Sequence, residues 1–317
     1  NLKVKKGEFL LLCGESGCGK TTFLRCLKSA VSPKGLKSGS ILFNGENIEN
    51  VKPIKQAELI GFVMQNPDSQ TVTDKVWHEM AFGLESIGMQ SGEIRLRVAE
   101  MSAFFGIEDW FHKDIDELSG GQKQILNLAS VMAMNPQVII FEEPTAQLDP
   151  VAADTFLNTV KKINNELGVT VIMAEHGTEE VFAMADRAVF MDGGSIYGEI
   201  DPKNPAGFTG KMYPFMPSAA RIWFSVKNNL KCPVTVGEGK NWLYEYSLTD
   251  TVKRALTEED TADEAGENAV EVKNIYFRYE KALPDVIKNM SLTVKNSEWL
   301  AVMGGNGAGK STLLSLI

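Results

Sequence analysis

A glycine-rich motif occurs twice in this chain, in the same sequence setting, at positions 290 residues apart. Residues 14–21 read GESGCGKT and residues 304–311 read GGNGAGKS, so both fit the pattern G-x-x-x-x-G-K-[ST]. Each copy follows an apolar run and precedes a helix-forming stretch, which predicts a strand, a tight loop and a helix. A chain with two such copies is expected to contain two domains of one α/β type.

This pattern is typical of a phosphate-binding loop. Its glycines let backbone N–H groups turn inward around a phosphate, and the following helix directs its positive end at the same anion. Lys20 is then expected to reach the β- and γ-phosphates, and Thr21 to place its hydroxyl on Mg²⁺. The motif therefore predicts a nucleoside triphosphate site in each copy.

Aligning residues 1–24 with residues 291–314 indicates how the chain is organised. The second copy has a strand-like lead-in between Val270 and Tyr279, whereas the first copy begins at Asn1 without one, and the second ends at Ile317. We therefore expect a fragment that is truncated at both ends. Its segments are a first nucleotide-binding domain at 1–200 that lacks its lead-in, an inter-domain region at 201–268, and the start of a second domain at 269–317.

Within the inter-domain region, residues 258–268 are acidic and poor in apolar residues, which is typical of a solvated linker. The part before it contains Trp223, Trp242, Tyr244 and Tyr246, which indicates some packed structure. The fold of residues 201–255 stays open at this stage.

Composition narrows the class of protein. Hydrophobic residues make up 44% of the chain, as in a globular protein with a core, and the net charge of −9 gives a nucleic-acid partner no general attraction. No apolar run approaches the roughly 20 residues that cross a bilayer. If the protein works at a membrane, another subunit must supply the span. The four cysteines lack C-x-x-C spacing and are interpreted as reduced thiols of a cytosolic protein.

Further motifs follow the first loop in a fixed order. A short strand at 61–64 ends at Gln65, and the sequence LSGGQ at 118–122 precedes a helical stretch at 123–134. A buried strand at 138–141 then ends in Glu142 and Glu143, and LDP follows at 148–150. A last apolar strand at 169–174 leads to His176.

In this order and spacing the motifs resemble the ATP-binding cassette (ABC) ATPases, over residues 1–200 and 270–317. The resemblance implies that Glu143 is the catalytic base that polarises water, that His176 holds the γ-phosphate, and that Gln65 touches Mg²⁺ and the attacking water. It also implies that the signature at 119–122 closes on an ATP bound to the opposite domain. Asp149 matches a residue of the loop that communicates between the two sites, and Tyr279 matches the aromatic residue that stacks on adenine.

The resemblance thus implies a full set of ligand contacts. ATP contacts are expected at Gly14, Glu15, Ser16, Gly17, Cys18, Gly19, Lys20, Thr21, Thr22, Ser119, Gly120, Gly121, Gln122 and Asp149, and in the second copy at Tyr279, Gly304, Gly307, Gly309, Lys310, Ser311 and Thr312. Mg²⁺ contacts are expected at Thr21, Gln65, Glu142 and Ser311. Glu142 departs from the family pattern, which has aspartate there. Because Mg²⁺ demands near-ideal octahedral geometry, the longer side chain leaves open whether metal binding is weakened.

The implied fold is an α/β phosphate-loop NTPase in three parts. A parallel-sheet core carries Cys13, Ile140 and Ile172 on neighbouring strands, with phosphates at the strands' carboxyl ends. A helical arm at roughly 71–134 carries the signature at the start of its last helix. A small antiparallel β piece around 39–44 is expected to brace the adenine side.

Three classes of cassette protein compete. DNA-repair cassettes insert long coiled coils between loop and signature, which this chain lacks. Soluble paired-cassette translation factors have a strongly basic linker, whereas acidic residues outnumber basic ones in 201–268. The segments at 65–70, 77–85 and 174–176 resemble the ATPases of energy-coupling factor (ECF) importers, and the tandem arrangement resembles their fused two-cassette form.

The ECF resemblance implies an ATP- and Mg²⁺-dependent ATPase at the cytoplasmic face of the cell membrane. It would power uptake of a vitamin, metal ion or similar solute. Its implied partners are a transmembrane coupling subunit, a substrate-binding membrane subunit and the second cassette of its own chain. The runner-up within this class is a nickel/cobalt or other importer motor, and the translation factor is the alternative outside it.

Overall fold

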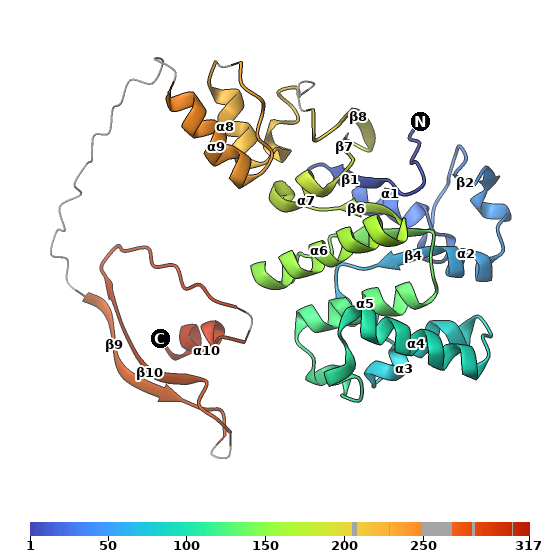
Figure 1. Ribbon diagram of the computed structural model, residues 1–317. Helices are drawn as coiled ribbons and strands as arrows, with labels where there is room; N and C mark the ends of the chain where they lie inside the picture. The colour runs from blue at the N-terminus through green and yellow to red at the C-terminus, as the bar shows by residue number, and fades with distance from the viewer. Residues whose placement is uncertain (205–207, 228, 249–267, 281–282, 306) are drawn as a thin grey trace. The chain divides into compact units, whose positions relative to one another are not determined.

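The computed structural model describes residues 1–204, 208–227, 229–248, 268–280, 283–305 and 307–317 (Figure 1). The chain divides into two compact units, Asn1–Val252 and Lys253–Ile317. The expected acidic linker lies outside the described residues except at Asn268, which begins a strand. Among the described residues, no helix is both long and apolar enough to cross a membrane.

A six-stranded sheet forms the centre of the first unit. Its order is β4-β5-β6-β1-β7-β8, and all neighbours are parallel except β7 and β8. The strands are β1 (Phe9–Cys13), β4 (Ile60–Val63), β5 (Val138–Glu142), β6 (Thr170–Ala174), β7 (Arg187–Asp192) and β8 (Ser195–Ile200). The expected parallel core is confirmed, because β5, β6 and β1 carry Ile140, Ile172 and Cys13 as neighbours.

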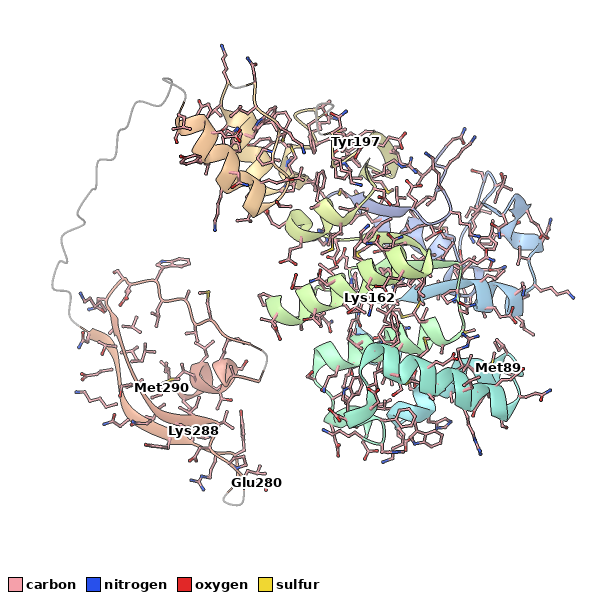
Figure 2. The ribbon with its side chains drawn as sticks, viewed as in Figure 1. Met89, Lys162, Tyr197, Glu280, Lys288 and Met290 are labelled. Carbon is pink, nitrogen blue, oxygen red and sulfur yellow. The ribbon has the colours of Figure 1, made fainter. Side chains whose placement is uncertain are left out.

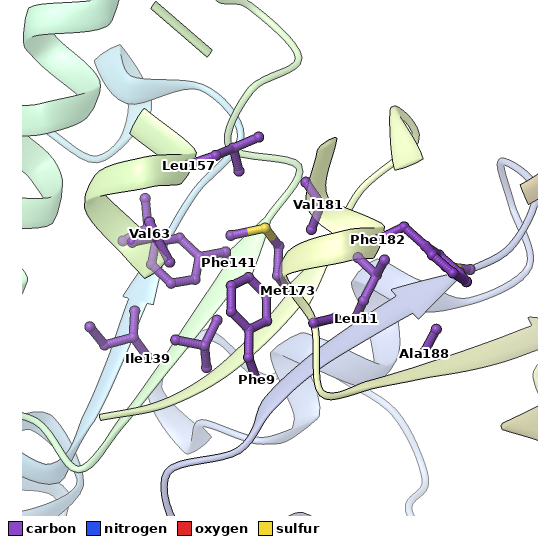
Figure 3. Packing of buried hydrophobic residues seen from close by; sticks show 14 of the residues in the cluster. Phe9, Leu11, Val63, Ile139, Phe141, Leu157, Met173, Val181, Phe182 and Ala188 are labelled. Carbon is purple, nitrogen blue, oxygen red and sulfur yellow. The ribbon is translucent and has the colours of Figure 1, made fainter. Parts of the chain in front are cut away.

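Alternation along each strand explains why the sheet is buried on both faces. In β1, Phe9 and Leu11 enter one apolar cluster, whereas Leu10 and Leu12 enter another on the opposite face. The first cluster includes residues of α6 (Pro150–Leu167) and α7 (Thr178–Met184), as Figure 3 shows for Leu157 and Phe182. The second lies against α1 (Lys20–Cys26) and α2 (Pro53–Leu59).

The expected helical arm and β piece are both present. The arm consists of α3 (Val76–Ser86), α4 (Ser91–Phe105) and α5 (Gly120–Ala133), which share a separate apolar cluster around Met80 and Leu126. Lys162 of α6, labelled in Figure 2, holds its ammonium group 4.8 Å from the centroid of the Phe104 ring on α4. The β piece is the antiparallel pair β2 (Leu42–Phe43) and β3 (Glu46–Asn47).

Residues after 200 also pack on the first unit, which continues to Val252 beyond the boundary expected from the motifs. Met212 joins the apolar cluster on the α6 face of the sheet. The region forms α8 (Ser218–Ser225) and α9 (Val236–Ser247), and Trp242 is buried. Ser218 donates its backbone N–H to Glu179 of α7 over 2.8 Å, and its hydroxyl to the same carboxylate.

The second unit contains β9 (Asn268–Phe277), β10 (Ile287–Lys295) and α10 (Lys310–Leu316). The strand expected directly before its glycine loop is not formed there, and Trp299 and Met303 are exposed. In the first unit the matching strand β1 is hydrogen-bonded between β6 and β7. The described part of the second unit has no such neighbours, so the apolar run has nothing to pair with.

Candidate nucleotide site

The first glycine loop joins β1 to α1 at the carboxyl edge of the sheet. A Cβ at Gly14 would lie 2.5 Å from the carbonyl oxygen of Met191, so the chain path allows only glycine there. Gly19 caps α1 with a φ of 104°, a left-handed conformation that favours glycine. The sequence pattern therefore reflects steric needs of this loop.

Lys20 spans the loop from inside. Its side chain is buried, and its Nζ donates to the carbonyl oxygens of Gly14 at 2.7 Å and Glu15 at 3.0 Å. The second loop repeats this arrangement, because Lys310 donates to Gly304 at 2.7 Å and Gly305 at 2.8 Å. The repeat seen in sequence is thus a repeat in geometry, even though the strand before the second loop is absent.

The residues expected to act on the attacking water meet beside the first loop. Glu143 follows β5, and its carboxylate lies 2.9 Å from Nε2 of His176 and accepts a hydrogen bond from Nε2 of Gln65 at 3.3 Å. Nε2 of His176 also lies 3.4 Å from the hydroxyl of Ser16 in the loop. Four motifs far apart in sequence therefore converge at the carboxyl ends of β1, β4, β5 and β6.

The backbone at Glu143 is strained. Its φ of 42° is unusual for a residue with a side chain, and its N–H donates to the carbonyl oxygen of Ala174 on β6 at 2.9 Å. A strained backbone of this kind persists only where the surrounding contacts hold it in place, and it occurs often at functional sites. The carboxylate is thereby turned toward Gln65 and His176.

A buried carboxyl group supports this cluster. Glu175 directly follows β6 and accepts hydrogen bonds from the backbone N–H and the hydroxyl of Thr145, at 3.0 and 2.8 Å. Burial raises the pKa of Glu175, and the negative charge of Glu143 adds to the effect. Sequence reasoning missed this role, although an acidic residue directly after an apolar strand was the signal for it.

Glu142 occupies the position expected to help hold Mg²⁺. Its buried carboxylate accepts hydrogen bonds from Nε and Nη2 of Arg25 on α1, at 3.1 and 3.2 Å. Thr21, Gln65 and Glu142 carry the hard oxygen donors that Mg²⁺ prefers, although both carboxylate oxygens of Glu142 here accept from Arg25. No group of three or more acidic, His or Cys side chains that could hold a metal exists among the described residues.

The signature forms the start of α5 in the helical arm. Ser119 and Gln122 build a reciprocal capping box, with Ser119 N–H donating to Oε1 of Gln122 at 2.9 Å. Asp149 likewise caps α6 by accepting from Val151 and Ala152 N–H groups. Across the described residues, no hydrogen bond joins residues 119–122 to the loop at 14–22, so the structure does not bring these two predicted parts of a site together.

In the second unit, Tyr279 lies near the second loop. Its hydroxyl is 2.8 Å from that of Thr312 on α10, while the side chain remains largely exposed. An exposed aromatic ring held beside a phosphate loop is suited to stacking on a base.

The ion pair of Arg25 and Glu142 yields a stability prediction. Replacing Arg25 with Met leaves a buried carboxylate without its partner and should lower the free energy of unfolding by about 1–2 kcal/mol, less than for a fully buried pair because Arg25 is half-exposed. The double change to Met at both positions should cost less than the single change. Urea unfolding followed by tryptophan fluorescence reports this, since four of the five tryptophans lie in the first unit. Additive effects of the two changes would contradict a coupled pair.

Comparison with known proteins gives a consistent answer. The family model described as "ABC transporter" matches residues 1–146 and 287–317. A putative ABC transporter ATP-binding protein of Bacillus thuringiensis is 40% identical over the whole chain, and one of Methanosarcina acetivorans is 30% identical over 99% of it. The chain spans 57% and 55% of the length of these relatives.

Two solved structures resemble the fold. The first is cbiO1 of Clostridium perfringens, described as part of the ABC transporter complex cbiONQ; it has a TM-score of 0.60 and 32% identity, and the match covers 67% of this chain and 84% of that one. The second is a dimeric ATP-binding cassette in a post-hydrolysis state bound to ADP and Pi, with a TM-score of 0.56 and 25% identity over 66% and 90% of the two chains.

Proposed function

This chain belongs to the ABC transporter family, and from that premise we propose that it is the ATP-binding and ATP-hydrolysing motor of an ECF-type importer. The observation that carries the proposal is the convergence of Glu143, Gln65 and His176 beside a complete phosphate loop. A carboxylate near a phosphate site, held by an amide and an imidazole, is suited to orient and polarise water for attack on a γ-phosphate.

In this proposal the loop residues bind the triphosphate and the cluster acts on water. Lys20 neutralises phosphate charge, His176 contacts the γ-phosphate, and Glu143 accepts the proton of the attacking water. Mg²⁺, when bound, would neutralise charge on the phosphates, and Thr21, Gln65 and Glu142 would hold it. Lys20 donates to two loop carbonyls, and these bonds hold its ammonium group inside the loop. A bound phosphate would replace the carbonyls as the acceptor.

The proposed whole protein has two cassettes that close on two ATP molecules. Residues 1–200 carry the motifs of the first, the region after 200 packs on that same unit before the chain continues to the second, and 269–317 begin the second. Each site would combine a loop from one cassette with a signature from the other. Closure on ATP and reopening after hydrolysis would drive the membrane subunits.

The importer type rests on the resemblance to cbiO1, whose described complex contains other subunits. We propose that this chain likewise works with a transmembrane coupling subunit and a substrate-binding membrane subunit at the cytoplasmic face of the membrane. The candidate docking surface is a groove of about 640 Å³ in the helical arm, lined by Trp77 and Ala81 of α3, Ile94 and Val98 of α4, and Phe111. The lining also includes the charged Glu85, Arg95 and Glu108, so it suits a short amphipathic helix from the coupling subunit.

An uptake assay tests the function. The full-length protein would be co-expressed with the integral membrane proteins encoded beside its gene, and accumulation of labelled B vitamins, Ni²⁺ and Co²⁺ would be measured. We expect ATP-dependent accumulation of one solute, abolished when Glu143 is replaced. ATP-dependent efflux, or co-sedimentation with ribosomes rather than membranes, would contradict the importer proposal while leaving the ATPase assignment to be judged separately.

The groove gives a prediction of its own. Trp77→Glu should lower solute uptake at least about 10-fold while ATP hydrolysis by the isolated full-length protein stays within twofold, because a buried charge at an interface is costly but the hydrolysis site is untouched. Leu96→Glu is the matched control, since Leu96 lies on α4, is exposed and is not part of the groove. Equal losses for both variants would argue against docking at this groove.

A further inference from the structure

The signature helix α5 buries two side-chain amides on its inner face. Gln124 is fully buried and Asn127 is 1% exposed, and both lie among apolar residues of the same helix such as Leu128. Nε2 of Gln124 donates to the carbonyl oxygens of Met64 at 3.2 Å and Pro144 at 3.1 Å, whereas Nδ2 of Asn127 donates to Pro67 at 3.1 Å. Because carbonyl oxygens only accept, the orientation of each amide follows from its partners.

The two partners of Gln124 adjoin the two residues that contact each other at the hydrolysis site. Met64 directly precedes Gln65, and Pro144 directly follows Glu143, while Gln65 and Glu143 share a hydrogen bond of 3.3 Å. The backbone of Met64 is held at its N–H as well, which donates to Oε1 of Gln70 at 2.8 Å. One side chain of α5 thus fixes the backbone next to both residues.

Gln124 satisfies two backbone carbonyl oxygens at once. An apolar side chain at this position would leave both carbonyls without this donor, and a buried acceptor left unsatisfied costs about 1–3 kcal/mol. Oε1 of Gln124 and Oδ1 of Asn127 have no hydrogen-bond partner among the described residues. Gln124, unlike Asn127, bridges the backbone beyond two separate strands, and that bridge needs an explanation beyond packing.

The position of Gln124 on α5 supplies one. Ser119 and Gln122 cap this helix, and Gln124 lies about 7.5 Å further along its axis than Ser119 at 1.5 Å per residue. Over so short a distance the helix moves as a rigid body, so a displacement of the signature displaces Gln124 by the same amount. Through its two hydrogen bonds, Gln124 would then move the backbone at Met64 and at Pro144 together.

We propose that Gln124 is a positioning residue that couples engagement of the signature to the placement of Gln65 and Glu143. The proposal rests on the proposed ATPase function. When the signature contacts nucleotide on the opposite cassette, α5 shifts and the amide of Gln124 moves both strand-end backbones together. Hydrolysis at this site then depends on whether the signature on the same cassette is engaged, which links the two sites of the dimer.

The test uses the full-length protein in which the second cassette's carboxylate that matches Glu143 is changed to glutamine. The second loop then still binds the ATP that the signature must engage, and only the first site turns over. Gln124→Met removes both donors and nearly keeps the volume of the side chain. We expect kcat to fall about 10-fold, with KM for ATP and the affinity for a fluorescent ATP analogue within twofold of the parent. Asn127→Leu is the matched control on the same helix, equally buried but bound only to Pro67, and kcat should stay within twofold.

A second comparison separates positioning from general damage. In a Gln65→Ala background, Gln124→Met should lower kcat by less than twofold, because the residue it positions is already gone. Gln124→Asn, which keeps the amide but shortens its reach, should also lower kcat if the two bonds matter. Multiplicative effects of Gln124→Met and Gln65→Ala, equal losses for Gln124→Met and Asn127→Leu, or an unchanged kcat would each overturn the inference. A parent protein that binds ATP but does not hydrolyse it would overturn the proposed function, and this inference with it.

Discussion

Glu143→Gln is expected to lower ATP hydrolysis at the first site at least about 100-fold while ATP binding persists, because general-base catalysis contributes roughly that much or more. Glutamine has the same shape as glutamate, so the hydrogen bond from Gln65 at 3.3 Å can still form. The amide cannot accept the proton of the attacking water. The change therefore removes the proposed chemistry while leaving the phosphate loop intact.

The measurement is single-turnover hydrolysis by the full-length protein in which the second cassette's carboxylate that matches Glu143 is changed to glutamine, so that the second loop keeps its ATP, together with binding of a fluorescent ATP analogue. Glu180→Gln is the matched control, since Glu180 is an exposed carboxylate on α7, four residues after His176. It should leave both quantities within twofold. Hydrolysis at the parent rate by the Glu143 variant would show that another group is the base.

The site could be predicted from sequence where local sterics decide the structure. A loop that needs glycine at positions 14 and 19, and a lysine that reaches back to two carbonyls, can be identified from residue types and spacing alone. The same holds for Ser119, whose cap with Gln122 follows the capping-box pattern. The helix cap at Gly19, the lysine and the capping box each act within a few residues of the chain, so local sequence suffices for them. At Gly14 the motif supplies the glycine, although the clash that requires it is with Met191 of β7.

Contacts between distant elements were beyond sequence reasoning. Glu142 was assigned to the metal from its place after β5, but its bonds to Arg25 exist only because α1 packs beside that strand end. The role of Gln124 cannot be predicted from sequence either, because a single amide on an apolar helix face forms no recognisable pattern. The strand before the second loop was predicted from its apolar run, yet strand formation depends on neighbours that the run cannot reveal.

One missed element did leave a signal. From sequence alone the fold of residues 201–255 stays open, although Thr235 and Glu238 form a capping box that begins α9. A search for this pattern would have located the helix. Its packing against the first unit would still have stayed unknown, because the domain boundary depends on contacts such as that of Ser218 with Glu179.

The second large effect is expected at Lys20. Lys20→Ala should weaken ATP binding at the first site at least about 100-fold, equivalent to about 2.7 kcal/mol at 1.36 kcal/mol per tenfold change. The lysine is buried and its ammonium group already lies within the loop, so the positive charge is prepared for the phosphates before they arrive. Alanine removes that charge and also the two bonds that brace the loop at Gly14 and Glu15.

Stoichiometry gives the sharpest measurement, because Lys310 makes the same pair of bonds in the second loop. In the full-length protein, equilibrium dialysis at an ATP concentration that saturates the parent should detect about two bound nucleotides per chain, and Lys20→Ala or Lys310→Ala alone should reduce this to about one. The double variant should bind almost none. Lys20→Arg separates charge from fit: the longer, forked side chain keeps the charge but not the reach into a closed loop, so weak binding by this variant would indicate that the loop selects lysine for its shape. If Lys20→Ala still binds two nucleotides under these conditions, the first loop does not depend on its lysine for binding, and the prediction drawn from the loop geometry is wrong.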